Sequence, residues 1–139
     1  MIVLEKIKVK TKKREGLTNI TSQVENVVKN SGIKKGVCRI FVPHTTAGIT
    51  INENADPAVA KDISNFLKKL IPKGGDKGYS FQHMEGNADS HIKSSLTGPS
   101  LTVLIHNRKL LLGTWQGIMF TEYDGPRTRK VYVQVQGEN

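Results

Sequence analysis

The sequence predicts one α+β domain over residues 1–139, on three observations. The length is that of one ordinary domain, which can bury a core without disulfides or a structural metal. Segments that alternate apolar with polar residues, typical of strands, occur near both ends of the chain. Segments with apolar residues three and four positions apart predict two or three helices between them. We therefore expect a β-rich α+β domain without internal repeats or linkers.

The first half of the chain is expected to hold three strands and one helix. Alternating charged and apolar residues predict the first strand, and two β-branched runs predict the others. Ser22 and Glu25 have the spacing of a capping box at the helix start. Asn19 or Thr21 could cap the helix instead, and Gly32 provides its stop. In order, the elements are a strand over 2–12, a turn over 14–18, a helix over about 21–30, and strands over 37–42 and 48–51.

The second half begins with a clear helix start. Asp56 as N-cap and Pro57 at the first helical position predict a helix that Pro72 ends. Its apolar stripe consists of Val59, Ile63, Phe66, Leu67 and Leu70. The next segment, 72–80, is Gly- and Lys-rich and suits either a mobile lid or an inert surface loop. The later elements are a short helix from Asp89 or Ser90 to Leu96, strands over 100–105, 110–112 and 113–120, a turn over 124–129, and a strand over 130–135.

Composition excludes several classes of protein. Hydrophobic residues make up 37% and charged residues 24%, which fits a folded chain and excludes a disordered one. The longest apolar runs are too short to cross a bilayer, and the N-terminal residues lack the pattern of a signal peptide. Cys38 is the only cysteine, so no internal disulfide can form. We expect a cytoplasmic protein without membrane contact, in which Cys38 is a small core residue.

The chain is basic, with a net charge of +9. Residues 1–40 hold ten Lys and Arg against three Asp and Glu, and the densest part is 6–14. Such a field could attract phosphate groups or nucleic acid. The favoured interpretation is a solvated strand face, since Lys6 and Lys8 alternate with apolar residues and no nucleic-acid motif accompanies the charge.

Residues 83–91 carry the strongest chemical signal, because two imidazoles and two carboxylates fall within nine residues. With His44 upstream, His83 and His91 could supply the three protein ligands of a zinc site. Magnesium prefers oxygen ligands, so zinc is favoured. Glu85 and Asp89 could ligate, orient the imidazoles or act as general acid or base. The alternative is that these histidines are merely exposed or hydrogen-bonded, the interpretation also given to His106.

Other polar residues could contact a substrate. Thr45, Asn52 and Glu53 flank the strand over 48–51, beside a helix start where free N–H groups attract anions, although helix capping explains part of this cluster. Thr114 and Gln116 share one face of the expected strand and Trp115 the other, which leaves pocket and core equally open for the indole. The further candidates for substrate contact are Lys93, Ser94 and Arg127, of which Arg127 is slightly favoured to be a solvated hairpin residue.

Sequence motifs of several common enzyme classes are absent. The chain contains no GxxxxGK[ST], GxGxxG, GxSxG or HExxH pattern. Nucleotide-binding, serine-hydrolase and zincin interpretations therefore lose their usual support.

Three segments together resemble the YjbQ family, described as secondary thiamine-phosphate synthase-like: residues 44–57, 83–95 and 113–118. The resemblance covers nearly the whole chain. It implies a β-sandwich or barrel-like core, a homotrimer, and a polar, metal-capable site formed by the three motifs. By motif match, His44, His83 and His91 correspond to candidate metal ligands of the family. The other candidate site residues that carry over are Glu53, Glu85, Asp89, Ser94, Thr114 and Gln116.

The resemblance also implies thiamine-phosphate synthase activity, which releases pyrophosphate. That reaction needs a cation at the leaving diphosphate and a surface on which a pyrimidine stacks. A divalent metal, Lys93 or Arg127, and Trp115 could supply these, although the histidines suit zinc hydrolysis or lyase chemistry at least as well. The leading hypothesis is a metal-dependent enzyme acting on a small phosphorylated substrate. The alternatives are a non-catalytic module that binds anions or nucleic acid on the basic N-terminal face, and an oligomer held by structural metal.

Overall fold

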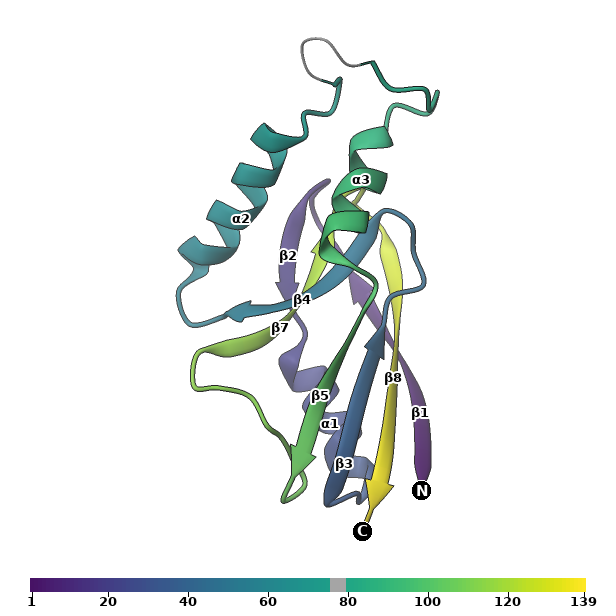
Figure 1. Cartoon of the computed structure of the whole chain (residues 1–139), viewed down its shortest axis with the longest axis vertical. Coiled ribbons are helices and arrows are strands. Elements are labelled where there is room, and N and C mark those ends of the chain that lie inside the picture. The colour runs from purple at the N-terminus through teal and green to yellow at the C-terminus, as the bar shows by residue number, and fades with distance from the viewer. Residues whose placement is uncertain (76–79) are drawn as a thin grey trace.

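The computed structural model describes residues 1–75 and 80–139, in which three helices lie between groups of consecutive strands (Figure 1). Their order confirms the α+β class. The helices are α1 (Thr21–Ser31), α2 (Pro57–Leu70) and α3 (Ala88–Thr97). The strands are β1 (Ile2–Lys10), β2 (Gly16–Asn19), β3 (Lys35–Phe41), β4 (Ala47–Glu53), β5 (Ser100–His106), β6 (Lys109–Leu110), β7 (Gln116–Glu122) and β8 (Thr128–Glu138).

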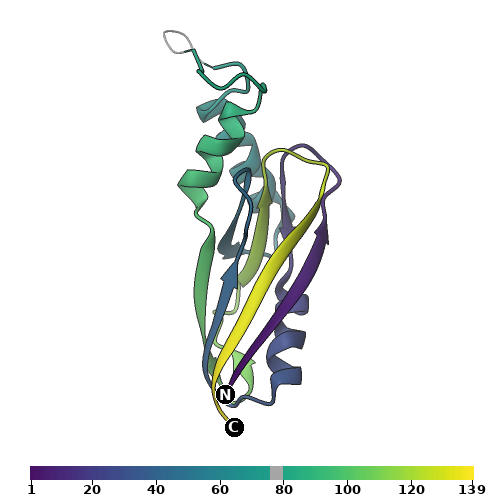
Figure 2. The same cartoon turned by 90° about the vertical axis from the view of Figure 1, so that its right-hand side faces the viewer.

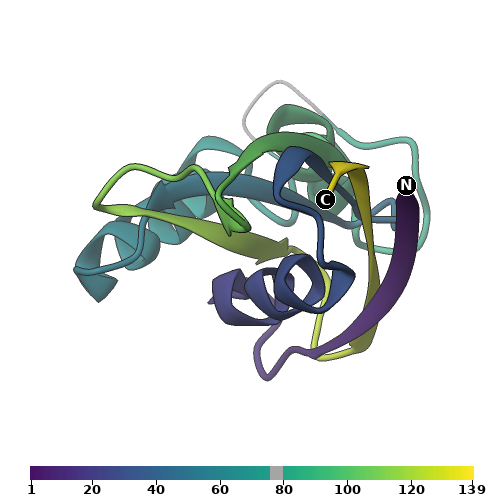
Figure 3. The same cartoon turned by 90° about the horizontal axis from the view of Figure 1, so that it is seen from below.

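The strands form two antiparallel sheets. One has the order β1-β8-β3-β5-β6 and the other β2-β7-β4. Seen along the long axis, the strands curl beside α1 as a half-barrel (Figure 3). The barrel-like core that the sequence analysis expected is therefore confirmed. The long strands β1 and β8 run side by side, with both termini at one end, where the Met1 ammonium donates to the Gly137 carbonyl at 3.1 Å (Figure 2).

The core lies between α1 and the inner faces of the strands. Val24 and Val28 of α1 are buried against strand residues such as Ile40, Phe120 and Val133. Cys38 is a buried member of this core, as expected, and burial raises the pKa of its thiol to about 12. The free energy of the fold thus comes chiefly from apolar burial around α1.

Strand β1 has the alternating exposure that the sequence pattern of the basic N-terminal segment predicts. Lys6 and Lys8 are exposed, whereas Ile7 is half-buried and Val9 is buried. β1 pairs only with β8, so it is an edge strand. Exposed lysines on an edge strand discourage pairing with a second chain.

The helix ends follow local signals, with one exception. The Asp56 carboxylate accepts the backbone N–H of Ala58 at 2.9 Å, and Gly32 ends α1 with a left-handed φ of 73°, both as expected. The capping box at Ser22 does not form. The alternative at Asn19 is the one observed: its side chain accepts the backbone N–H of Thr21, two residues later, at 3.0 Å.

The apolar stripe of α2 is largely uncovered. Ser64 is the one buried residue of this helix, while Phe66 is 65% and Leu70 56% exposed. The sequence correctly indicated an amphipathic helix. Its apolar face, however, finds little of the protomer's core to pack against, unlike that of α1.

Two elements differ from expectation. Residues 14–18 include strand β2 as well as a turn. Thr114 and Trp115 lie in a turn and β7 begins at Gln116, so the strand over 113–120 is wrong at its start. The chain leaves β6 after two residues, and consequently Thr114 and Gln116 do not share a strand face. The lid hypothesis for 72–80 rests partly on residues 76–79, which lie outside the described residues.

Buried charged side chains tie the two sheets together. Arg129 of β8 donates from Nε to Oε1 of Glu122 on β7 at 2.9 Å, and from Nη2 to Oγ1 of Thr46 at 2.9 Å. Thr11 donates to the same carboxylate at 2.7 Å. Burial alone would raise the pKa of Glu122, but the hydrogen bonds from Arg129 and Thr11 outweigh it and lower that pKa.

Among the described residues, no helix is long and apolar enough to cross a membrane.

Candidate functional site

Two imidazoles meet at the outer end of α3. The ring centroids of His83 and His91 are 5.0 Å apart, with an angle of 78° between the planes. Glu85 places Oε2 3.7 Å from Nε2 of His83, and both side chains are largely exposed. A turn at Gly86, whose φ is +79°, folds the chain back so that His83 reaches the first turns of the helix. Asn87 fixes this turn by donating to the Asp124 carboxylate at 2.9 Å.

The two histidines are suitable ligands for a divalent metal, but they are too few to form a complete site. Imidazole nitrogen and carboxylate oxygen are zinc ligands, and catalytic zinc sites use three protein ligands. Across residues 1–75 and 80–139, no three His, Cys, Asp or Glu side chains are gathered closely enough to hold a metal ion. One chain thus offers two imidazole ligands with Glu85 beside them, which is not a complete set of metal ligands.

His44 is engaged elsewhere. It follows β3, and its Nε2 accepts the backbone N–H of Lys130 at 2.9 Å. Partial burial, reinforced by the Arg129 cation, lowers the pKa of His44, so the ring is held neutral. Only Nδ1 remains available to a ligand. In a single protomer, His44 does not complete a three-histidine metal centre with His83 and His91.

Asp89 and Lys93 lie on α3 but belong to a buried ion-pair network. The Lys93 ammonium lies 2.8 Å from Oδ2 of Asp89 and 2.6 Å from Oε1 of Glu15. Arg14 donates to Oδ1 of Asp89 at 3.1 Å. Burial alone would raise the pKa of Asp89, but the hydrogen bonds from Arg14 and Lys93 lower it. Neither Asp89 nor Lys93 is exposed, so a catalytic or substrate-binding role for either requires this network to open.

Arg14 and Glu15 are residues that the sequence analysis missed. They stand at the end of the basic N-terminal segment, more than seventy residues from their partners. The one signal was a carboxylate next to an arginine just before a glycine turn. That signal is too common to identify the partner.

Ser94 and Ser90 anchor α3 to the strands. The Ser94 hydroxyl donates to the Ala47 carbonyl at 2.7 Å, and the Ser90 hydroxyl donates to the Tyr123 carbonyl at 2.6 Å. Both residues are buried. The inner face of α3 is therefore committed to packing against β4 and the end of β7, while His91 lies half-exposed on the same helix.

The other two motifs meet at the far end of β4. Glu53 lies opposite Gln116 in the antiparallel register, and the Asn54 N–H donates to the Trp115 carbonyl at 3.0 Å. A Cβ on Gly117 would lie 2.3 Å from the Asn54 side chain, so this close approach requires glycine. Trp115 is 63% exposed. This surface is polar and open, with an indole at its rim.

The two candidate surfaces lie at opposite ends of β4. Ser94 of α3 contacts Ala47 at the beginning of the strand, and Glu53 stands at its end (Figure 1). Seven strand residues span about 20 Å. The histidine pair and the surface around Glu53 and Trp115 are therefore separate within one protomer.

The remaining candidates are dispersed. Thr45, Asn52 and Thr114 are exposed. Arg127 donates from Nε to the Asp124 carbonyl at 2.7 Å and is exposed, as expected for a solvated hairpin residue. His106 is exposed at the end of β5.

Comparison with known proteins identifies relatives over the full length. A family model described as UPF0047 protein YjbQ-like matches residues 5–138. The UPF0047 protein MJ1081 of Methanocaldococcus jannaschii is 55% identical over 136 residues, which covers 98% of this chain and 96% of that protein. The UPF0047 protein YugU of Bacillus subtilis is 47% identical over 135 residues, covering 97% and 100%.

Solved structures show the same fold. An uncharacterised YjbQ/UPF0047 protein of Clostridium acetobutylicum superposes with a TM-score of 0.90 at 51% identity, covering 95% of this chain and 99% of that one. A YbjQ-like protein of unknown function from Sulfolobus solfataricus has a TM-score of 0.92 at 35% identity, covering 99% of both chains. The names of these four relatives state no substrate and no reaction.

Proposed function

Since the chain belongs to the YjbQ-like UPF0047 family, we propose that it is a cytoplasmic, metal-dependent enzyme acting on a small phosphorylated substrate. Thiamine-phosphate synthesis is the first reaction to assay. The observation that carries the proposal is the pair of exposed His83 and half-exposed His91 beside Glu85. Packing explains neither the pairing of two rings at the surface nor the carboxylate beside them.

The proposed metal is zinc rather than magnesium. Two imidazoles outnumber the single nearby carboxylate, and magnesium prefers oxygen ligands. When bound, the metal would act as a Lewis acid that stabilises negative charge on a phosphoryl oxygen. Glu85, next to His83, is positioned to orient that ring or to accept a proton from a bound group.

We further propose that a homotrimer completes the site. Within one protomer the histidine pair and Glu53 lie toward opposite ends of β4, which spans about 20 Å, so a second copy would bring them together. The uncovered side chains Phe66 and Leu70 of α2 provide apolar surface for such an assembly. Trp115 would supply a face on which a pyrimidine stacks. The polar groups around it in the proposed shared site are Thr45, Asn52, Glu53, Thr114 and Gln116.

Elemental analysis of untagged protein tests the metal. We expect about one zinc per chain in the natural protein. We expect little zinc in His83→Ala and His91→Ala, because each variant loses one of the two imidazole ligands. Circular dichroism checks that both variants remain folded. His106→Ala removes an exposed histidine outside the motifs and serves as the matched control. Equal zinc in all four proteins, or equal loss in His106→Ala, would contradict the proposal.

Turnover distinguishes the enzyme from an oligomer held by structural metal. The zinc-loaded protein is incubated with hydroxymethylpyrimidine diphosphate and thiazole phosphate, and released pyrophosphate is measured. We expect Trp115→Ala to lower turnover while zinc content stays unchanged, because the exposed indole would stack on the pyrimidine and is not a metal ligand. Zinc removal that dissociates the assembly, without turnover in the loaded protein, would favour the structural-metal alternative.

A further inference from the structure

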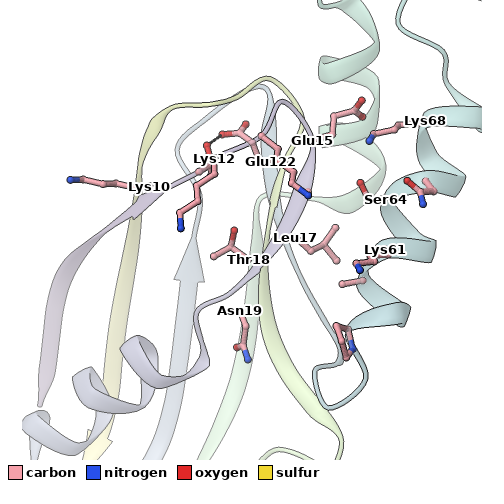
Figure 4. Close-up of a pocket in the computed structure, with 16 residues that line it drawn as sticks. Lys10, Lys12, Glu15, Leu17, Thr18, Asn19, Lys61, Ser64, Lys68 and Glu122 are labelled. Atoms are coloured by element: carbon pink, nitrogen blue, oxygen red, sulfur yellow. Dashed lines mark hydrogen bonds between the residues drawn. The ribbon is translucent and has the colours of Figure 1, made fainter.

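A cleft separates α2 from the edge strand β2. Its volume is about 550 Å³. Lys61, Ser64 and Lys68 line the helix side, and their spacing places them on one face of α2. Figure 4 shows these three side chains facing β2, with Leu17 across the cleft. Ser64 is the buried residue of the helix, so the hydroxyl lies deep in the cleft while the two ammonium groups flank it.

The cleft is strongly cationic. Within the part of the chain that the structure describes, none of its lysines forms an ion pair, and they are Lys10, Lys12, Lys13, Lys61 and Lys68. Two carboxylates also line it, but both are already paired. Glu15 is 2.6 Å from the Lys93 ammonium, and Glu122 accepts from Arg129 at 2.9 Å. Because no counter-charge is free, the cleft presents a positive potential to any solute.

The lysines are distributed around the cleft. Lys61 and Lys68 are seven residues apart on α2, which places their helix positions about 10 Å apart. Lys10 and Lys12 lie on the other side of β2 from the helix, so they add to the positive field without facing α2 (Figure 4). Lysine stems are long and flexible, so the ammonium groups of Lys61 and Lys68 can both reach one compact ligand between them. A ligand with two phosphate groups offers each ammonium a partner.

The lining also argues against nucleic acid. Single-stranded nucleic acids bind on aromatic side chains that stack the bases. No residue among the sixteen that line the cleft is aromatic; the apolar ones are Leu17, Pro57 and Ala60. The volume lies within the range of small-molecule pockets.

We propose that this cleft binds a small molecule carrying two or more phosphate groups. None of the candidate metal or catalytic residues lines it. The site is thus separate from the histidine pair, and the proposal does not depend on the enzymatic function proposed above. Lysine ammonium groups and the Ser64 hydroxyl bind phosphate oxygens directly, without a metal.

Isothermal titration with inorganic pyrophosphate, in the presence of a chelator, tests the proposal on the full chain. Lys68→Ala removes one charge-assisted contact and should weaken binding about tenfold. Lys69→Ala is the matched control, because it removes the same charge from the next residue of the helix, outside the cleft lining. The control should bind within about twofold of the natural protein.

A neutral variant separates shape from charge. Ala60→Leu fills the cleft at constant net charge with a residue that favours helix, and it should also weaken pyrophosphate binding about tenfold. His83→Ala should leave that binding unchanged, which distinguishes failure at this site from failure at the metal site. The proposal would be overturned by absence of pyrophosphate binding, by equal loss in Lys69→Ala, or by tighter binding of a single-stranded oligonucleotide than of pyrophosphate.

Discussion

The two halves of the segment 83–95 place similar side chains in opposite environments. His83 and Glu85 are exposed at the outer end of α3, whereas Asp89 and Lys93 are fully buried on the same helix. A buried charge must keep its partner, because desolvation is costly, while an exposed one is free to bind a ligand. Membership in one motif therefore does not give its residues one role. The inner half stabilises the helix position, and the outer half is left available for chemistry.

The largest expected effect comes from removing the buried cation. Lys93→Met removes the buried ammonium that Glu15 and Asp89 share, leaves only the partly exposed Arg14 between them, and should lower the free energy of unfolding by about 3–5 kcal/mol. Urea denaturation measures it. Lys69→Met, on the exposed side of α2, should change that free energy by less than about 0.5 kcal/mol. Adding Glu15→Gln to Lys93→Met should restore part of the loss. Equal, small changes in both single variants would show that the network is not stabilising.

Acid should weaken the same network. The pKa of Asp89 is lower in the folded protein than in the unfolded chain, so its contribution is complete above the unfolded pKa, near 4, and is lost as pH falls through the folded value. We expect the free energy of unfolding to decline below about pH 4. Asp89→Asn should make that decline shallower, whereas Asp62→Asn, exposed on α2, should leave the slope unchanged. Parallel slopes in all three proteins would contradict the assignment.

The smallest expected effect lies in the exposed half. His83→Ala should change the free energy of unfolding of the metal-free protein by less than about 0.5 kcal/mol, because the ring lies at the surface and outside the hydrophobic core. Thermal unfolding in a chelator measures it. A loss as large as that of Lys93→Met would remove the contrast between the two halves.

Elements marked by local chemistry were predictable. Asp56 and Pro57 start α2, and Gly32 ends α1, because capping depends only on neighbouring residues. The start of α1 at Thr21 was also predictable, but the choice of Asn19 over the capping box at Ser22 was not, because both are local patterns of similar strength. The turn at Thr114 and Trp115 was not predicted, because a continuous run of strand-forming residues does not show where one strand ends and the next begins.

The candidate site was predictable in its residue types and not in its geometry. The spacing of His83 and His91 correctly brought two imidazoles together, because a turn followed by a helix is a local structure. The separation of Glu53 from that pair depends on how β4 runs between them, which no local pattern shows. Likewise, Glu15, one of the two partners of Lys93, lies in a loop that only tertiary folding brings to α3.

The junction of the two sheets bears on how the protein responds to heat. It is closed by Arg129 and Glu122, whereas apolar packing around α1 supplies most of the rest. The cost of desolvating ions falls as temperature rises, while the stabilisation per unit of apolar area levels off. The ion pair at the junction between the sheets therefore contributes a larger share of the stability on warming, and the fold depends on Arg129 more when hot than when cold.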